Sequence, residues 1–136
     1  METIKVEVHW CEKNYACAVE FPDFGSVIVT NKSLEGLKKD FEESLKWTIE
    51  DSLEAGDPVP DYLCKGDYAI EYSLAVSALL RSAEKYTTMA VLSRVTGINQ
   101  RQLSNYASEV KIPRPAQRDK IISGLREIGR EIAALC

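Results

Sequence analysis

Residues 93–106 read SRVTGINQRQLSNY, and this stretch decides the fold of the second half of the chain. Gly97 lies between two short amphipathic segments, where a glycine can adopt the left-handed backbone of a tight turn at little steric cost. Ser93, a small residue four positions earlier, lets two helices approach each other, and Asn99 is a favourable N-cap for the second. The pattern predicts two helices joined by a glycine turn, as in helix-turn-helix DNA-binding domains.

The second of these helices is expected to have an apolar and a polar face. Ile98 and Leu103 bury the inner face, which leaves polar side chains, Gln102 among them, on the outer one. We expect Gln100 and Arg101 to reach base edges in a major groove. The full set of expected DNA-binding residues is Asn99, Gln100, Arg101, Ser104, Asn105, Tyr106, Lys111, Arg114 and Gln117. The alternative is an ordinary helical domain, in which a glycine turn joins two helices that do not contact DNA.

A proline-rich turn follows and leads into a long final helix. Pro113 and Pro115 end the preceding helix, and Pro115 or Ala116 is the first position of the next. Arg114 and Gln117 near that helix start either suit a phosphate or belong to an ordinary solvated turn. One apolar stripe follows the helix through Ile121, Ile122, Leu125, Ile128, Ile132 and Leu135. The end of the stripe forms either a dimer face or part of the domain core, and we expect at least a homodimer.

The charges divide unevenly between the two halves of the chain. The formal net charge is −4, but residues 1–73 hold 7 Lys, no Arg and 16 Asp or Glu, which gives −9. Residues 74–136 hold 10 Lys or Arg and 5 acidic residues, which gives +5. A basic module can neutralise phosphates, whereas an acidic module is repelled by nucleic acid and favours a basic protein. We therefore expect two domains, 1–73 and 74–136, unless the acidic surface serves solubility alone.

Length and composition exclude several classes of protein. The 136 residues are 45% hydrophobic, contain no long apolar run and lack the start of a secretory signal, so we expect a cytoplasmic protein without a membrane span. The four cysteines form no CxxC motif and His9 is the single histidine, so a zinc site is not expected. We expect reduced cysteines, no bound metal and no cofactor.

Alternating apolar residues predict a small sheet in the first half. Strands are expected at residues 4–10, 15–21 and 27–30, before a helix that Ser33 caps and Gly56 ends. The apolar positions of this helix are Leu34, Leu37, Phe41, Leu45, Ile49 and Leu53. A fourth strand at residues 68–72 gives an α+β domain of order βββαβ with the helix over one face of the sheet. A helix over residues 74–86 then joins the two domains.

The first half resembles the HicB antitoxin family. The resemblance is carried by FPDFG at residues 21–25, the strand that follows, the long helix and the GDPVP loop at residues 56–60. It implies a degenerate, catalytically inactive ribonuclease H-like domain. The second half resembles the all-α, Xre-like helix-turn-helix domain that follows it in many members, so the resemblance covers nearly the whole chain. The proline that commonly precedes the glycine in the family is Phe24 in this chain.

The resemblance also implies a function. HicB antitoxins neutralise HicA, a small basic ribonuclease that degrades mRNA, and they bind the operator of their own operon. We expect a HicA-like toxin to contact the loop at Asp23 and Phe24, together with acidic residues that the sequence does not single out. The alternative is a ligand-sensing helix-turn-helix regulator that has no toxin partner, or an adaptor with a degenerate helix-turn-helix.

Catalysis by the first half is not expected. Ribonuclease H chemistry needs several carboxylates that converge on two divalent metal ions. The candidates on the predicted strands are Glu7, Glu20 and Glu71, and alternation places Glu7 and Glu20 opposite the apolar residues of their own strands. A solvated sheet face explains these positions equally well.

Overall fold

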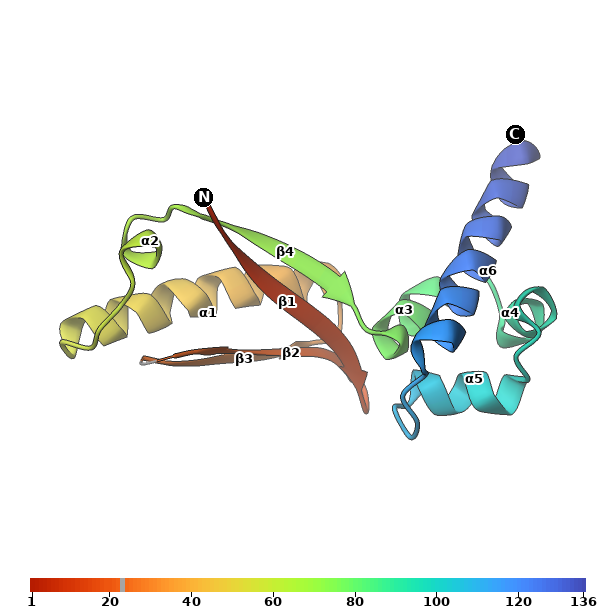
Figure 1. The fold of residues 1–136 in the computed structure, drawn as a ribbon, viewed down its shortest axis with the longest axis horizontal. Coiled ribbons are helices and arrows are strands. Elements are labelled where there is room, and N and C mark those ends of the chain that lie inside the picture. The colour runs from red at the N-terminus through yellow and green to blue at the C-terminus, as the bar shows by residue number, and fades with distance from the viewer. Residues whose placement is uncertain (23) are drawn as a thin grey trace. The chain divides into compact units, whose positions relative to one another are not determined.

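The computed structural model describes residues 1–22 and 24–136, and the chain forms two compact units, Met1–Ala75 and Val76–Cys136 (Figure 1). The first unit is mixed α+β, and the second is built from helices. The division falls two residues after the predicted boundary, because the fourth strand continues to Leu74. The joining helix predicted over residues 74–86 is therefore wrong at both ends, since it spans only Val76–Ala83.

The first unit is a mixed sheet with a long helix against it. Its elements are β1 (Glu2–Cys11), β2 (Asn14–Phe21), β3 (Gly25–Asn31), α1 (Leu34–Glu54), α2 (Asp61–Cys64) and β4 (Tyr68–Leu74). The strand order is β3-β2-β1-β4, with β1 antiparallel to β2 and parallel to β4. The order βββαβ matches the prediction, and the single turn of α2 was not expected.

The sheet has a buried and an open face because its apolar residues alternate along each strand. Ile4, Val6 and Val8 of β1 are buried, whereas the residues between them are exposed. The helix α1 lies against β3 and β2, and its buried residues follow the predicted spacing as far as Ile49. Leu53, predicted to continue this face, is half exposed, because 3.6 residues per turn bring Ser52 to the inner side instead.

The second unit packs four helices around one core. They are α3 (Val76–Ala83), α4 (Met89–Thr96), α5 (Gln100–Ala107) and α6 (Pro115–Ala134). Pro115 is the first residue of α6, which is one of the two predicted positions. The buried core residues are Val76, Leu80, Leu92, Ile98, Leu103, Tyr106, Ile121 and Ile128. None of the helices in the described part of the chain is long and apolar enough to cross a membrane.

Gly124 sets the closest approach of α6 to α4. A Cβ atom at this position would lie 2.6 Å from Cγ2 of Thr96 and 3.5 Å from Cγ1 of Val95. Contacts below 3.0 Å between a Cβ atom and another side chain essentially never occur in proteins. The two helices can therefore hold this distance only because residue 124 has no side chain.

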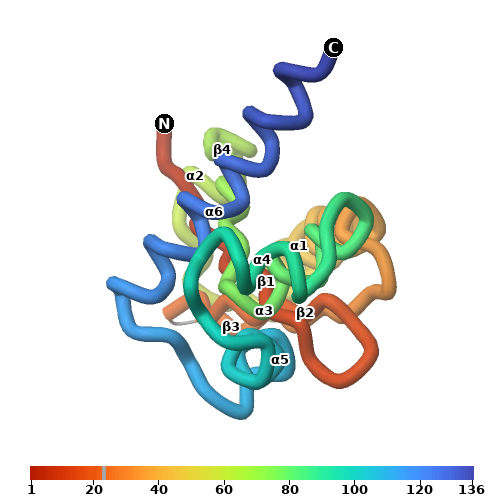
Figure 2. Tube along the Cα trace, turned by 90° about the vertical axis from the view of Figure 1, so that its right-hand side faces the viewer, coloured from red at the N-terminus to blue at the C-terminus, as the bar shows by residue number. Residues whose placement is uncertain are grey.

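The apolar stripe of α6 divides into a buried and an exposed part. Ile121 and Ile128 belong to the core, whereas the exposed fraction of the side chain is 48% at Ile132 and 87% at Leu135. The last turns of α6 extend beyond the other helices of this unit (Figure 2). An apolar hollow of about 440 Å³ lies beside them, lined by residues of α3, the segment after it and α6, including Leu79, Tyr86 and Ile132.

Two glycines of α6 are expected to respond in opposite directions to alanine substitution. Gly124→Ala should lower the free energy of unfolding by about 1–3 kcal/mol, because the new methyl group overpacks the contact with Thr96. Gly129→Ala is the matched control, since a Cβ there meets nothing within 4 Å and alanine favours a helix by about 0.5–1 kcal/mol. Thermal unfolding of both variants measures the difference. Equal stability of the two variants would show that α4 and α6 do not pack closely at Gly124.

Candidate nucleic-acid interface

The turn between α4 and α5 is fixed by its own backbone and side chains. Gly97 has φ 76° and ψ 4°, and its N–H donates to the carbonyl of Ser93 at 2.9 Å. The Thr96 hydroxyl donates to the Leu92 carbonyl at 2.7 Å and accepts from the Ile98 N–H at 3.2 Å. The predicted left-handed glycine is thus confirmed, and Thr96 adds a second constraint that the sequence did not reveal.

The start of α5 is capped as predicted. The Asn99 side-chain oxygen accepts from the Gln102 N–H at 2.8 Å, which satisfies one of the free donors of the first turn. Leu103 is fully buried beneath the helix. The cap at its first turn and the burial of its inner face therefore fix the orientation of α5 within the second unit.

The outer face of α5 carries polar side chains that are open to solvent. Gln100, Arg101 and Ser104 are exposed, and Asn99 is exposed beside them. Asn105 is half-buried. Helical spacing places residues 100, 101 and 104 on neighbouring positions of one face, so they can contact the same ligand.

Gln102, expected on the outer face of α5, and Tyr106, expected near a phosphate, instead contact other residues of the second unit. Tyr106 is only 4% exposed and belongs to the core, because its ring packs with the other buried apolar residues of this unit. Its hydroxyl accepts a hydrogen bond from Nε2 of Gln102 at 2.9 Å, and Gln102 is half-buried. We therefore correct both expectations: Tyr106 is a core residue, and Gln102 supports its hydroxyl.

Three residues predicted to lie near phosphates come together beside α5. Lys111, Arg114 and Gln117 line an open hollow of about 590 Å³, together with Gln102 and Tyr106. Arg114 is the N-cap residue of α6, so the hollow opens at a helix start whose first N–H groups have no partner within the helix. Two cations and these donors can hold an anion such as a phosphate group.

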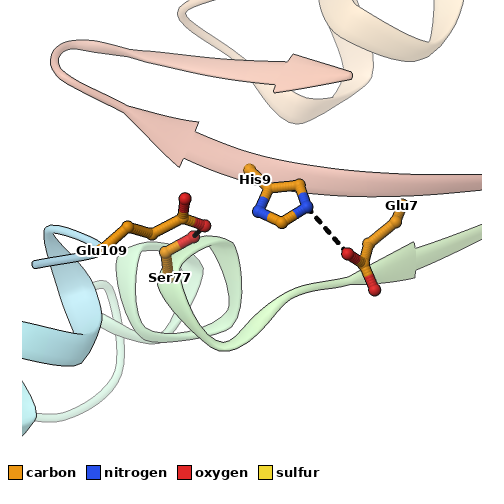
Figure 3. Close-up of polar contacts among 4 residues, drawn as sticks. All are labelled: Glu7, His9, Ser77 and Glu109. Atoms are coloured by element: carbon orange, nitrogen blue, oxygen red, sulfur yellow. Dashed lines mark hydrogen bonds and ion pairs between the residues drawn. The ribbon is translucent and has the colours of Figure 1, made fainter. Parts of the chain in front are cut away.

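The loop that carries Lys111 is held by a hydrogen bond from a buried hydroxyl. The Ser77 hydroxyl, in α3, donates to Oε1 of Glu109 at 2.6 Å (Figure 3). Ser77 is 1% exposed, and Glu109 adopts a left-handed backbone with φ 59°. The Lys111 N–H then donates to the Asn105 carbonyl at 3.2 Å, which returns the loop to α5. Sequence analysis missed this contact, because 32 residues separate its partners.

The loop also presents an apolar residue that the sequence analysis did not single out. Ile112 is 81% exposed and lines the hollow next to Lys111. Val110, Lys111 and Ile112 alternate in polarity over three residues only, which is too short to give a periodic signal in the sequence. An aliphatic side chain in this place can contact a sugar or a thymine methyl group.

In the first unit, the predicted toxin-binding loop is described only in part. Asp23 lies outside the described residues. Phe24 is half-buried, and its ring stacks on that of Phe21 with 5.1 Å between the ring centroids. Both rings line an open hollow with Glu20 and Asp57, so aromatic and acidic groups meet at this end of the sheet.

The carboxylates considered for catalysis lie on the open face of the sheet. Oε1 of Glu7 forms an ion pair with Nε2 of His9 at 2.7 Å, two residues along β1 (Figure 3). Glu71 lies opposite Lys5 and Glu20 opposite Ser26 in the strand register. Among the described residues, no group of three His, Cys, Asp or Glu is placed to hold a metal ion.

Burial shifts the pKa of Cys17 and of Tyr72 in the first unit, and both side chains serve packing. Burial raises the pKa of the Cys17 thiol, while Cys11, Cys64 and Cys136 are exposed free thiols. Burial, with smaller contributions from the charges of Glu42 and Cys17, raises the pKa of Tyr72 to about 12. The Tyr72 hydroxyl donates to the Lys38 carbonyl at 3.2 Å, so β4 is tied to α1 by a neutral phenol.

Removal of the buried hydroxyl at Ser77 should destabilise the second unit. Ser77→Ala takes a donor from the Glu109 carboxylate, which should cost about 1–3 kcal/mol in the free energy of unfolding. Ser108→Ala is the control, because this exposed hydroxyl donates to the Ser104 carbonyl in the last turn of α5 and its loss should change stability by roughly 0.5 kcal/mol or less. Urea unfolding of both variants tests the contact. A Ser77→Ala variant as stable as the control would mean that Glu109 does not depend on this bond.

Comparisons with models of protein families, with curated proteins and with solved structures find no match to this chain. The choice of a function therefore depends on the geometry of the chain's own residues, on the charge of each unit and on the resemblance carried by residues 21–25 and 56–60. Of these, the geometry of α4, α5 and the loop that follows is the most specific.

Proposed function

We propose that this chain is an antitoxin of the HicB kind that also represses its own operon. In this proposal α4 and α5 are the helix-turn-helix of the second unit, and they bind operator DNA. The first unit is a degenerate ribonuclease H-like domain that neutralises a small basic ribonuclease of the HicA kind. It carries out no catalysis, needs no cofactor and acts in the cytoplasm.

One observation carries the DNA-binding part of the proposal. The helix α5 is capped by Asn99, follows a left-handed turn at Gly97 and leaves Gln100, Arg101 and Ser104 exposed on one face. A single α-helix fits the major groove of B-DNA, and these side chains can read base edges there. The hollow with Lys111 and Arg114 lies on the flank of α5, where the DNA backbone would pass.

The distribution of charge supports different partners for the two units. Leu74 and Ala75 carry no charge, so the net charges of −9 and +5 counted for residues 1–73 and 74–136 also belong to the two compact units. The basic unit attracts nucleic acid and gains affinity by counterion release. The acidic unit repels nucleic acid and attracts a basic protein, which is the charge expected of a HicA-like toxin.

The exposed end of α6 supports a homodimer through the second unit. Ile132 and Leu135 project from the last turns, next to the apolar hollow that Leu79, Tyr86 and Leu125 help to line. Apolar side chains and an apolar hollow on the same unit can pair with their counterparts in a second copy about a two-fold axis. Helix-turn-helix dimers bind two half-sites about one helical turn apart.

Base contacts and phosphate contacts should respond differently to mutation. Arg101→Ala should weaken binding to the DNA upstream of its own gene by about 1–3 kcal/mol and leave binding to unrelated DNA nearly unchanged. Lys111→Ala should weaken binding to all sequences alike and reduce the slope of log affinity against log salt by about one. Fluorescence anisotropy with both DNAs at several salt concentrations separates the two effects.

Arg130→Ala is the matched control for these variants. Arg130 is an exposed arginine near the end of α6, so its loss removes the same charge far along the helix from the hollow at Arg114. It should change neither specificity nor the salt slope appreciably. If Arg101→Ala binds the upstream DNA as tightly as the control does, α5 is not the recognition helix.

Dimerisation through α6 should be lost when a charge replaces Ile132. Ile132→Asp places a carboxylate in the proposed apolar interface, and sedimentation velocity at micromolar concentration should then show a monomer. Val110→Asp is the control, because Val110 is an exposed aliphatic residue of the same unit in the loop before α6. A wild-type chain that sediments as a monomer, or an Ile132→Asp variant that stays dimeric, would refute this interface.

A further inference from the structure

The outer face of α1 presents an exposed tryptophan. The exposed fraction of the Trp47 side chain is 69%, although its neighbours along the helix, Leu45 and Ile49, are buried. A large aromatic side chain loses favourable burial when it stays in water, and tryptophan is enriched among the residues that dominate protein–protein binding energy. Trp47 is not part of the core of this unit, so its ring is available to contact a partner.

Four carboxylates surround Trp47 on the same face of the helix. Glu43 lies one turn before it, Glu50 and Asp51 one turn after it, and Glu54 two turns after it. All four are exposed, and no side-chain ion pair or hydrogen bond joins them to another residue within residues 1–22 and 24–136. The stripe from Glu43 to Glu54 is about 16 Å long at 1.5 Å per residue. We call these five residues the Trp47 face.

The composition of the Trp47 face selects a cationic protein partner. An arginine or lysine of the partner can stack on the indole ring and at the same time pair with a carboxylate one turn away. A central aromatic residue within a charged rim is the arrangement in which a desolvated anchor supplies affinity and the rim speeds association. Nucleic acid does not fit here, because four negative charges surround the ring.

The Trp47 face adjoins the loop already considered for partner binding. The Ser52 hydroxyl, on the inner side of the same half of α1, lies 3.5 Å from the Phe24 carbonyl oxygen. Phe24 and its hollow therefore border the last turns of α1, where Glu54 lies. A partner that covers the last two turns of α1 can reach Phe24 without crossing the sheet.

We propose that the Trp47 face is the principal docking surface for the basic toxin, with Trp47 as its anchor. This inference rests on the proposed function of the first unit and names the residues that perform it. Trp47 packs against aliphatic and guanidinium groups of the partner, and Glu43, Glu50, Asp51 and Glu54 pair with its cations. The loop at Phe24 then forms the edge of the interface.

The test compares two exposed hydrophobic residues of the first unit in the full-length chain. Trp47→Ala removes the proposed anchor, and Ile28→Ala, a residue 73% exposed on the open face of the sheet, is the control. The probe is the purified basic protein encoded by the adjacent reading frame, and calorimetry measures its dissociation constant. Trp47→Ala should weaken binding about tenfold or more, and Ile28→Ala less than about threefold. Both side chains are exposed, so thermal unfolding should show both variants folded.

A charge variant tests the acidic rim independently. Glu50→Gln with Glu54→Gln should slow association and flatten its salt dependence, whereas Glu2→Gln with Glu12→Gln, the same charge change on exposed residues at the start of β1 and in the turn after it, should not. Equal affinity of Trp47→Ala and wild type for the basic protein would overturn the Trp47 face and leave the proposed function standing. No binding by the wild-type chain would overturn both. A change in oligomeric state on Trp47→Ala without the partner would assign the face to a second copy instead.

Discussion

The contact between Gly124 and Thr96 is the one on which the surface of the second unit depends. Thr96 lies against the bare backbone of α6 at Gly124. The hydroxyl of the same side chain bonds to the Leu92 carbonyl and to the Ile98 N–H, at the end of α4 and the start of the turn. The packing of α4 on α6 and the path of the chain into α5 are therefore coupled through one side chain. A larger residue at position 124 would displace Thr96 and release the Ile98 N–H.

The far end of α5 is held by a second constraint of the same kind. Ser77 holds the side chain of Glu109, whose backbone is left-handed, and the loop then turns back so that Lys111 and Arg114 line one hollow. Asn99 holds one end of α5 and this loop holds the other, so the helix presents its polar face in one fixed orientation. Ordering of this kind before binding lowers the entropy lost when a ligand binds. This is the physical basis for the proposed use of α5 as a rigid reading element.

The two units differ in how they would recognise a partner. The second unit offers separate cations and polar groups on a helix and a loop, which suits a ligand with regularly spaced charges such as DNA. The first unit offers an aromatic ring within a rim of carboxylates on α1, which suits a folded basic protein. In the proposed function, the opposite net charges of −9 and +5 would keep these two partners on different units, because each unit would repel the partner of the other.

Features with a local cause could be predicted from the sequence, and features with a distant cause could not. Gly97, Asn99 and Pro115 act on their own turn or helix start, and each was placed correctly. The bond from Ser77 to Glu109 and the close contact at Gly124 join segments far apart in the chain, so no local pattern reveals them. Tyr106 was misjudged because a tyrosine suits both a core and a phosphate. The fourth strand was predicted at residues 68–72, but its last two residues were missed because the pairing of Leu74 with Val8 lies 66 residues away.

The most direct test of the central claim is an NMR titration of the isotope-labelled full-length chain with DNA from upstream of its own gene. Amide signals of α5 and of residues 108–118 should shift, and those of the first unit should not. Shifts concentrated in the sheet or α1, or no shift at low salt, would contradict the division of binding between a basic reading unit and an acidic protein-binding unit.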